Sequence, residues 1–148
     1  MKKYIEVKEA LIEEMVSKEA CESQVERALT CDSWDELKVV IADNILWLRD
    51  NEVKLPDDYY KSSLGEFTIV NGVLHGQLKA WYSNGQPMVH EHYVNGVRHG
   101  ESKWFYDNGQ IGIEKHYENG LKHGECKNYY ENGQLWVHSH YVNGEKIV

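Results

Sequence analysis

Histidine is the residue type in this chain whose spacing most directly suggests chemistry. All eight histidines lie between residues 75 and 140, and six of them recur every 24 residues. The six form two series: His75, His99 and His123, and His92, His116 and His140. Imidazole binds metals such as zinc and exchanges protons near neutral pH. The pattern therefore raises a metal site or acid–base catalysis as the first chemistries to test.

Asn-Gly dipeptides indicate the elements that hold these histidines. They fall into two series, each with an interval of 24 residues: Asn71-Gly72, Asn95-Gly96, Asn119-Gly120 and Asn143-Gly144, and Asn84-Gly85, Asn108-Gly109 and Asn132-Gly133. Asn-Gly readily supplies the two positive φ angles of a type I′ turn, so each dipeptide predicts a hairpin turn. The spacing predicts a meander of copied hairpins, which offers a long open surface and no deep cleft.

This architecture argues against a shared metal site. Equivalent residues of adjacent hairpins are two strands apart, about 9–10 Å, whereas zinc holds nitrogen ligands at about 2.0–2.1 Å. Closer pairs remain as local alternatives: His90 with His92, His138 with His140, and His92 with His99. The histidines that precede glycine are better explained by turn-stabilising hydrogen bonds. No P-loop, nucleophile elbow, HExxH or dinucleotide fingerprint occurs. We expect no catalytic residue, no metal and no cofactor, and thus not an enzyme.

The first part of the chain is predicted to be a small helical head. Apolar residues from Ile5 to Leu29 recur at spacings of three and four, and Ser33 with Glu36 forms a capping-box pattern before a further helix. Pro56 ends the helical region. The predicted class is α+β: a head over residues 1–55 that caps the array, a connector over 56–63, and an elongated antiparallel meander over 64–148. The meander has three full 24-residue repeats after a degenerate first half-unit.

Strand alternation sorts the repeat side chains onto two faces. A two-residue turn at Asn108-Gly109 pairs Lys103 with Glu114. The predicted buried face holds Ala80, Tyr82, Val89, Tyr93, Trp104, Tyr106, Ile111, Ile113, Tyr117, Tyr130, Leu135, Val137 and Tyr141. The predicted partner-binding residues lie on the other face: Lys79, Trp81, Met88, His92, Lys103, Phe105, His116, Lys127, Tyr129, Trp136 and His140. Large aromatic groups beside lysine and histidine are typical of interface hot spots.

Charge is distributed unevenly along the chain. Residues 1–70 carry 16 acidic and 9 basic side chains, a net charge of −7, whereas residues 71–148 carry 8 and 7, a net charge of −1. Without a basic stripe, direct nucleic-acid binding is disfavoured. The acidic head either meets a basic partner surface or only confers solubility. The apolar runs are too short for a membrane span, the N-terminus does not resemble a signal peptide, and three scattered cysteines fit a reducing compartment; we expect a cytoplasmic protein.

The repeats also resemble a known family. The units that begin at Gly76, Gly100 and Gly124 share NGxxHG, an aromatic pair, NGQ and a terminal tyrosine. These motifs are similar to MORN-variant repeats over residues 64–148, but not over the head. The resemblance implies stacked antiparallel hairpins that contact proteins. Lipid binding is attributed to some eukaryotic relatives, and some bacterial members are described as antitoxins.

These observations favour a non-catalytic, intracellular protein-binding module. The leading hypothesis is an inhibitor or antitoxin-like protein of bacterial or phage origin whose partner is a toxin, a nuclease or a defence complex. One alternative is a phage anti-defence protein that blocks a nucleic-acid-binding host complex, such as a CRISPR complex or another nuclease. A second alternative is peripheral membrane or phospholipid binding, which the near-neutral array disfavours. Pairing of open sheet edges into a homodimer is left open.

Overall fold

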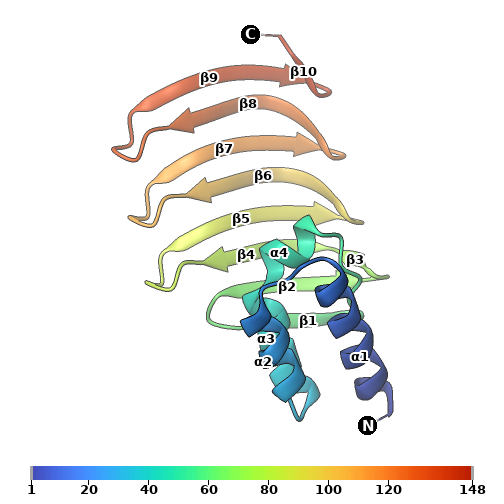
Figure 1. Cartoon of the computed structure of the whole chain (residues 1–148). Coiled ribbons are helices and arrows are strands. Elements are labelled where there is room, and N and C mark those ends of the chain that lie inside the picture. The colour runs from blue at the N-terminus through green and yellow to red at the C-terminus, as the bar shows by residue number, and fades with distance from the viewer. Residues whose placement is uncertain (1, 148) are drawn as a thin grey trace.

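The computed structural model describes residues 2–147, with side chains at all of these positions except 2–4 and 7. Helices α1 (Lys2–Ser17), α2 (Glu22–Thr30), α3 (Trp34–Asp43) and α4 (Ile45–Asp50) form the head. A single antiparallel sheet follows, and its strands are stacked one beside the next along the molecule (Figure 1). The predicted α+β class, with a helical head before a hairpin meander, is confirmed.

Local signals account for the helix ends. The Ser33 hydroxyl accepts a hydrogen bond from the Glu36 amide at 3.2 Å, and the Glu36 carboxylate accepts one from the Asp32 amide at 2.8 Å. These bonds satisfy amide groups at the start of α3, as the capping-box pattern predicts. Residues 17–20 end α1: Glu19 has a φ of 59° and the Ala20 amide bonds to the Met15 carbonyl.

The strands run in the order β1-β2-β4-β5-β6-β7-β8-β9-β10, and the short β3 pairs with β2. Their bounds are β1 Asp58–Lys61, β2 Gly65–Val70, β3 Val73–Leu74, β4 Gly76–Trp81, β5 Pro87–Val94, β6 Val97–Phe105, β7 Ile111–Glu118, β8 Leu121–Tyr129, β9 Leu135–Val142 and β10 Glu145–Lys146. Strand β1 thus lies within the segment expected to be a connector. It forms one edge of the sheet, and being short and charged it is a poor template for further pairing.

The two Asn-Gly series form different turns. Asn95 and Gly96 have φ values of 49° and 83°, and Val94 pairs with Val97, so this series adopts the predicted two-residue type I′ turn. In the second series only the glycine has a positive φ, and Tyr106 bonds to both Gly109 and Gln110. This is a three-residue turn with the glycine in the left-handed region, and the predicted two-residue turn is wrong here. In this series the side-chain oxygen of the asparagine accepts a hydrogen bond from the backbone amide two residues later.

A β-bulge follows each three-residue turn and changes the face of neighbouring residues. Trp104 pairs with Ile113 but Phe105 pairs with Ile111, so Gly112 is the extra residue. A Cβ on Gly112 would lie 2.4 Å from the Trp104 ring, which places this position on the same face as Trp104. The same register shift occurs beside Trp81 and beside Tyr129.

The bulge corrects the predicted faces at the residues that follow the turns. Met88, expected on the partner face, packs against the buried core, and Trp136 stacks on Tyr130 with a centroid distance of 5.7 Å. Ile111 and Leu135, expected to be buried, pair directly with Phe105 and Tyr129 on the opposite face. Counted from the two-residue turn at Asn95-Gly96 without interruption, Val89 would pair with Ser102. A second shift, of two residues, pairs Val89 with Trp104 instead. A shift of two keeps alternation in phase, so the remaining assignments hold.

The head covers one face of the sheet, which we call the inner face; the opposite one is the outer face. The core joins head and sheet, with Leu37, Ile41 and Leu48 from the helices and Phe67 and Leu78 from β2 and β4. Gly65 lets α3 approach closely, because a Cβ there would lie 1.9 Å from the Ala42 carbonyl oxygen. We expected the head to cap an open edge; instead it covers a face over β1–β5 and leaves β6–β10 uncovered (Figure 1).

Candidate binding surfaces

A buried carboxylate marks the boundary between the covered and uncovered parts of the inner face. Glu91 on β5 is 6% exposed and accepts hydrogen bonds from four groups. The donors are Arg49 of α4 (2.7 Å), Tyr93 (2.7 Å), Arg98 (3.0 Å) and Ser102 (3.2 Å). A buried charge is tolerated when it is paired and hydrogen-bonded. Glu91 therefore links α4 to the sheet.

The cluster changes the proton affinity of its members. Burial and the Glu91 carboxylate raise the pKa of Tyr93 to about 12, so its hydroxyl remains a donor at neutral pH. Burial alone lowers the pKa of Arg49, but hydrogen bonding to Asp50 and the charge of Glu91 together raise it above its ordinary value. Tyr93 and Arg49 therefore keep their protons near neutral pH and act as hydrogen-bond donors to Glu91.

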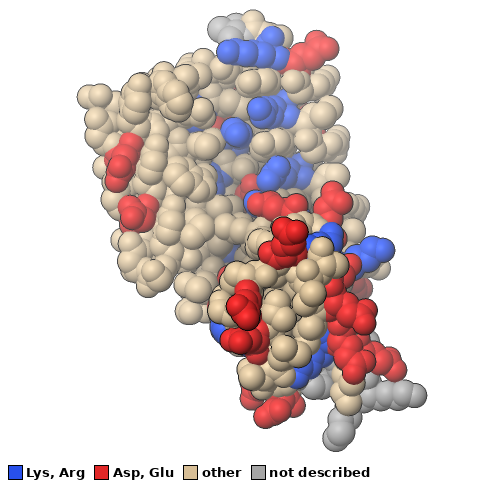
Figure 2. Space-filling view, in the orientation of Figure 1, with Lys and Arg blue, Asp and Glu red and all other residues tan. Residues whose placement is uncertain are grey.

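Equivalent positions in the later repeats carry different chemistry. Lys115 stands where Glu91 does one repeat earlier, and Lys122 stands in place of Arg98. Lys122 lies over the Tyr141 ring with its Nζ 4.9 Å from the centroid, and Arg98 lies over Tyr117 at 5.5 Å. Burial and the charge of Lys122 lower the pKa of Lys115. Figure 2 shows Lys and Arg on the open part of this face, whereas most acidic groups in this view lie on the helices.

One large apolar side chain in each repeat fills the same place on the inner face. The residue pairs that share it are Ala80 with Met88, Trp104 with Gly112, and Asn128 with Trp136. In the second repeat the Trp104 ring covers Gly112 and meets Tyr106 at 4.8 Å; in the third, the Trp136 ring meets Tyr130. A small residue on one strand thus accompanies a large one on its neighbour. Trp136 is 59% exposed and Tyr130 49%.

The outer face holds most of the residues predicted to bind a partner. Cross-strand pairing aligns one row across the sheet: Lys61, Glu66, Lys79, His90, Lys103, Glu114, Lys127 and His138. Lys103 pairs with Glu101 at 2.9 Å and with Glu114 at 3.4 Å, which confirms the predicted Lys103–Glu114 pair, and Lys127 pairs with Glu125. Lys103 and Lys127 on the outer face are therefore already partnered within the chain.

The other predicted outer-face residues form two further rows. Trp81, Phe105 and Tyr129 make an aromatic row at one end of the strands, opposite Pro87, Ile111 and Leu135. His92, His116 and His140 lie opposite Gln77, Glu101 and Glu125 on separate strands. His92 Nδ1 lies 3.1 Å from the His99 carbonyl, so the pair predicted to face each other is in contact through the backbone.

The histidines before glycine stabilise turns of the next repeat. Nδ1 of His75, His99 and His123 accepts a hydrogen bond from the amides of Asn95, Asn119 and Asn143, at 3.3, 3.4 and 3.5 Å. This is the turn-stabilising role that the sequence suggested. Across residues 2–147, no three His, Cys, Asp or Glu side chains are arranged to hold a metal ion. None of the helices in this range is long and apolar enough to cross a membrane.

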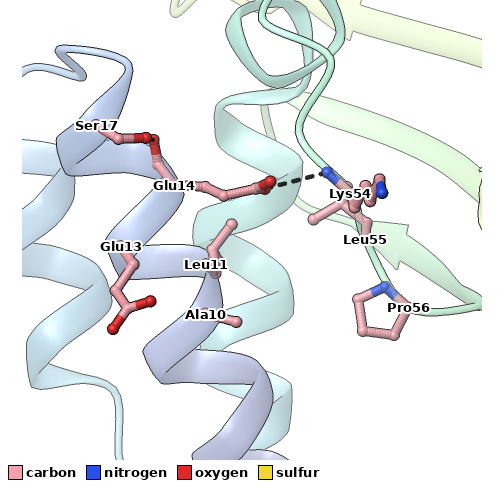
Figure 3. A pocket seen from close by; sticks show the side chains of 8 residues that line it. All are labelled: Ala10, Leu11, Glu13, Glu14, Ser17, Lys54, Leu55 and Pro56. Atoms are coloured by element: carbon pink, nitrogen blue, oxygen red, sulfur yellow. Dashed lines mark hydrogen bonds between the residues drawn. The ribbon is translucent and has the colours of Figure 1, made fainter.

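One hollow lies in the head and lacks catalytic geometry. It is an open groove between α1 and residues 54–56, with Leu11, Glu14 and Lys54 among its lining (Figure 3). The Glu14 carboxylate accepts a hydrogen bond from the Lys54 amide at 3.2 Å, and the Ser17 hydroxyl donates to the Glu14 carbonyl. These contacts join α1 to the chain that enters the sheet. No nucleophile and base face each other among the residues that line the groove.

Comparison with known proteins agrees with the repeat geometry. The family model described as "MORN repeat variant" matches residues 74–95, 98–119 and 122–143. Each matched segment begins one residue into the strand that follows a type I′ turn and ends at the asparagine of the next turn of that kind. These are MORN-variant repeats. Such repeats are commonly protein- or membrane-binding modules and are generally non-enzymatic.

Other comparisons add little to the MORN-variant assignment. None of the curated proteins compared with the chain matches it. Among solved structures, the chain is similar to the Glycosylation Associate Protein (Gap123) complex from Streptococcus agalactiae, with 14% identity, a TM-score of 0.37, and coverage of 66% of this chain and 19% of that one. It is also similar to a TarM mutant from S. aureus in complex with fondaparinux, alpha-GlcNAc-glycerol and UDP. Here the identity is 13% and the TM-score 0.36, and the match covers 71% of this chain and 24% of that one. The chain spans less than a quarter of the length of either structure.

Sequence reasoning missed the lysines on the inner face of the MORN-variant array. It assigned this whole face to the core, so Lys115, Lys122 and Lys146 were not considered. Their positions were nevertheless readable. Lys115 lies two residues from Tyr117 on one strand, and two-residue turns pair Lys122 with Tyr117 and Lys146 with Tyr141. The sequence did not show how many strands of the inner face the head covers. That extent decides whether Lys115 lies beneath the helices or on the open part of the face.

Proposed function

We propose that this protein is a non-catalytic protein-binding module of the MORN-variant class. One observation carries the proposal: the head covers only part of the inner face, and large apolar side chains remain exposed beyond it, with Trp136 at 59% and Tyr130 at 49%. Exposed aromatic groups clustered on a rigid sheet are typical of protein interfaces. The outer aromatic row of Trp81, Phe105 and Tyr129 is a second predicted contact surface, flanked by Lys79, Lys103 and Lys127 and by His92, His116 and His140.

Inhibition is the form of binding that we favour. An open rigid sheet blocks another protein by occupying its surface and needs no chemistry of its own. We therefore propose an antitoxin-like inhibitor of bacterial or phage origin, acting in the cytoplasm on a toxin, a nuclease or a defence complex. The acidic head supports the anti-defence variant of this idea, because it resembles nucleic acid in charge and would suit a groove that binds nucleic acid, as in a CRISPR complex.

Membrane binding is the second candidate function, because MORN repeats are commonly membrane-binding modules as well as protein-binding ones. The inner-face cations supply some attraction for anionic lipid. They are few, however, and the acidic head lies beside them, so we rank protein binding first. Flotation with vesicles of phosphatidylserine and phosphatidylcholine tests the membrane candidate directly.

Separate substitutions on the two faces test the proposed function. Tagged protein is used to capture partners from a bacterial lysate, and capture is compared for Trp81→Ala on the outer face and Trp136→Ala on the inner face. We expect one stoichiometric partner whose recovery falls at least about tenfold with one of the two substitutions, as for a hot-spot residue. Recovery of chaperones alone, unchanged by either substitution, overturns the proposal. Elemental analysis of the purified protein tests whether it carries a metal.

A further inference from the structure

The open part of the inner face forms a trough that continues from the helical head. Its floor is a row of directly paired residues that runs from β5 to β9: Glu91, Ser102, Lys115, Cys126 and Ser139. Cys126 and Ser139 are only 6% and 5% exposed, although no helix covers them, because taller side chains stand on both sides. The floor is therefore set below its flanks.

The two walls of the trough differ in character. One wall is apolar and aromatic, with Trp104, Ile113 and Trp136 along it. The other is basic, with Arg98, Lys122 and Lys146, each directly opposite a tyrosine on the neighbouring strand. The inner-face positions described on β6–β10 include no carboxylate. A body that fits this trough needs one apolar side and one acidic side.

The covered end of the same face shows what kind of element fits. Helices α3 and α4 lie on this face, and Figure 1 shows α4 in front of β4 and β5, with the later strands uncovered beyond it. At this end the sheet supplies the carboxylate, Glu91, and the helix supplies the cation, Arg49. One repeat later the sheet supplies a cation, Lys115, at the position of that carboxylate. A helix docked there must supply the carboxylate itself.

We infer that the open trough binds an acidic amphipathic helix of a partner protein, with a carboxylate seated between Lys115 and Lys122. This inference rests on the proposed protein-binding function and names the partner's recognition element. Lys115 is half-buried, and its ammonium group makes no hydrogen bond or ion pair with the side chains and backbone described between residues 2 and 147, unlike those of Lys103 and Lys127 on the outer face. Lys122 is held over Tyr141, so this cation is positioned before the partner arrives.

A helix suits the trough better than a polyanion does. The chain has a net charge of −8, and its acidic head lies next to the trough. Nucleic acid and anionic membranes carry charge over their whole surface, so the head repels them, and the cations of the trough are too few to offset this. An amphipathic helix carries its carboxylates on one stripe and buries apolar groups on the other.

A pair of synthetic helices tests the inference on the full-length protein. The acidic probe is a fluorescein-labelled helix with leucines at i, i+3, i+4 and i+7 and glutamates beside them, and the control peptide has lysines in place of the glutamates. Binding is followed by fluorescence anisotropy at about 0.15 M salt. We expect the acidic peptide to bind and the basic one not to. Absence of binding by the acidic peptide up to about 0.1 mM overturns the inference, as does equal binding of both peptides.

Matched substitutions locate the binding to one face. Lys115→Gln with Lys122→Gln removes two charges from the inner face, and Lys103→Gln with Lys127→Gln removes two from the outer face. We expect at least about a tenfold loss of affinity for the first pair and less than about twofold for the second, with circular dichroism confirming that both variants are folded. Equal losses, or a loss only in the outer-face pair, overturn the inference.

The remaining outcomes separate this inference from the proposed function. A single-stranded DNA 20-mer or phosphatidylserine vesicles that bind through Lys115 and Lys122 more tightly than the peptide overturn it, as does a dimer that these substitutions dissociate in sedimentation. If partner capture depends on Trp81 while the inner-face pair has no effect on it, protein binding stands and the helix site is wrong. If neither face affects capture, the proposed function itself is wrong.

Discussion

The covered and open parts of the inner face differ although they are built from the same repeat. Under the helices the face carries Leu78, Ala80 and a buried carboxylate, Glu91, whose charge Arg49 and Arg98 balance. Beyond the helices the equivalent positions carry Ser102 or Cys126, Trp104 or Asn128, and Lys115. The turns and the strand pairing are unchanged between the two parts. The repeat therefore sets the same backbone geometry in both parts. The side chains on the inner face differ according to whether the helices cover them.

The strongest test of this difference compares two aromatic residues on the inner face. Phe67 is 1% exposed and stacks on Tyr60 at a centroid distance of 4.7 Å, so Phe67→Ala leaves a cavity beneath the head. We expect it to lower the free energy of unfolding by about 3–5 kcal/mol. Trp136→Ala removes a side chain that is mostly solvated and is expected to cost about 1 kcal/mol or less. Urea unfolding followed by circular dichroism measures both, and equal losses would show that the open part is as tightly packed as the covered one.

A second test compares two carboxylates. Glu91→Gln leaves Arg49 and Arg98 without a balancing charge, and we expect a loss of about 3 kcal/mol in the free energy of unfolding. Glu101→Gln on the outer face removes an exposed carboxylate from Lys103, and we expect about 0.5 kcal/mol. The same urea titrations apply. A loss of under about 1 kcal/mol for Glu91→Gln would mean that the buried cluster does not hold α4 to the sheet.

Sequence periodicity predicted the repeat well but not the surface. The fixed Asn-Gly interval gave the hairpins, and alternation placed Lys103 opposite Glu114 and Tyr117 on the inner face. It failed at Met88 and Trp136, because two Asn-Gly series that look alike form turns of different length, and the longer turn is followed by a bulge. Turn length depends on φ at the asparagine, which the dipeptide alone does not decide.

The position of the head was the other information absent from the sequence. Apolar residues at helical spacing show that a helix has a buried stripe, not which surface buries it. The expected capping of an edge was a reasonable alternative, since an open edge strand invites pairing. Gly65 was the available signal, because a glycine inside a strand often marks a close approach, here to the carbonyl of Ala42 in α3.

A third test, with a smaller expected effect, concerns Trp104 and Gly112. It asks whether this large and small pair in the open part can be replaced by the pair found in the covered part. Gly112→Met alone forces a side chain into the Trp104 ring, and we expect a loss of about 1–3 kcal/mol. Trp104→Ala with Gly112→Met recreates the Ala80–Met88 pair and should recover about 1 kcal/mol or more relative to additivity. Trp81→Ala with Gly112→Met is the control, because Trp81 lies on the outer face, and its two effects should simply add.

The smallest expected effect is on the outer face, which no helix covers in any repeat. Burial and the charges of Lys79 and Lys103 lower the pKa of His90. The unfolded chain therefore binds a proton at His90 more readily than the folded protein does, so His90 disfavours folding as pH falls through its ordinary value of about 6.5. We expect His90→Gln to flatten the rise in the urea midpoint between about pH 5 and pH 7. Lys103→Met should flatten it partly, because it removes one of the charges that act on His90. A steeper rise in either variant would show that the outer-face row does not act on His90 in this way.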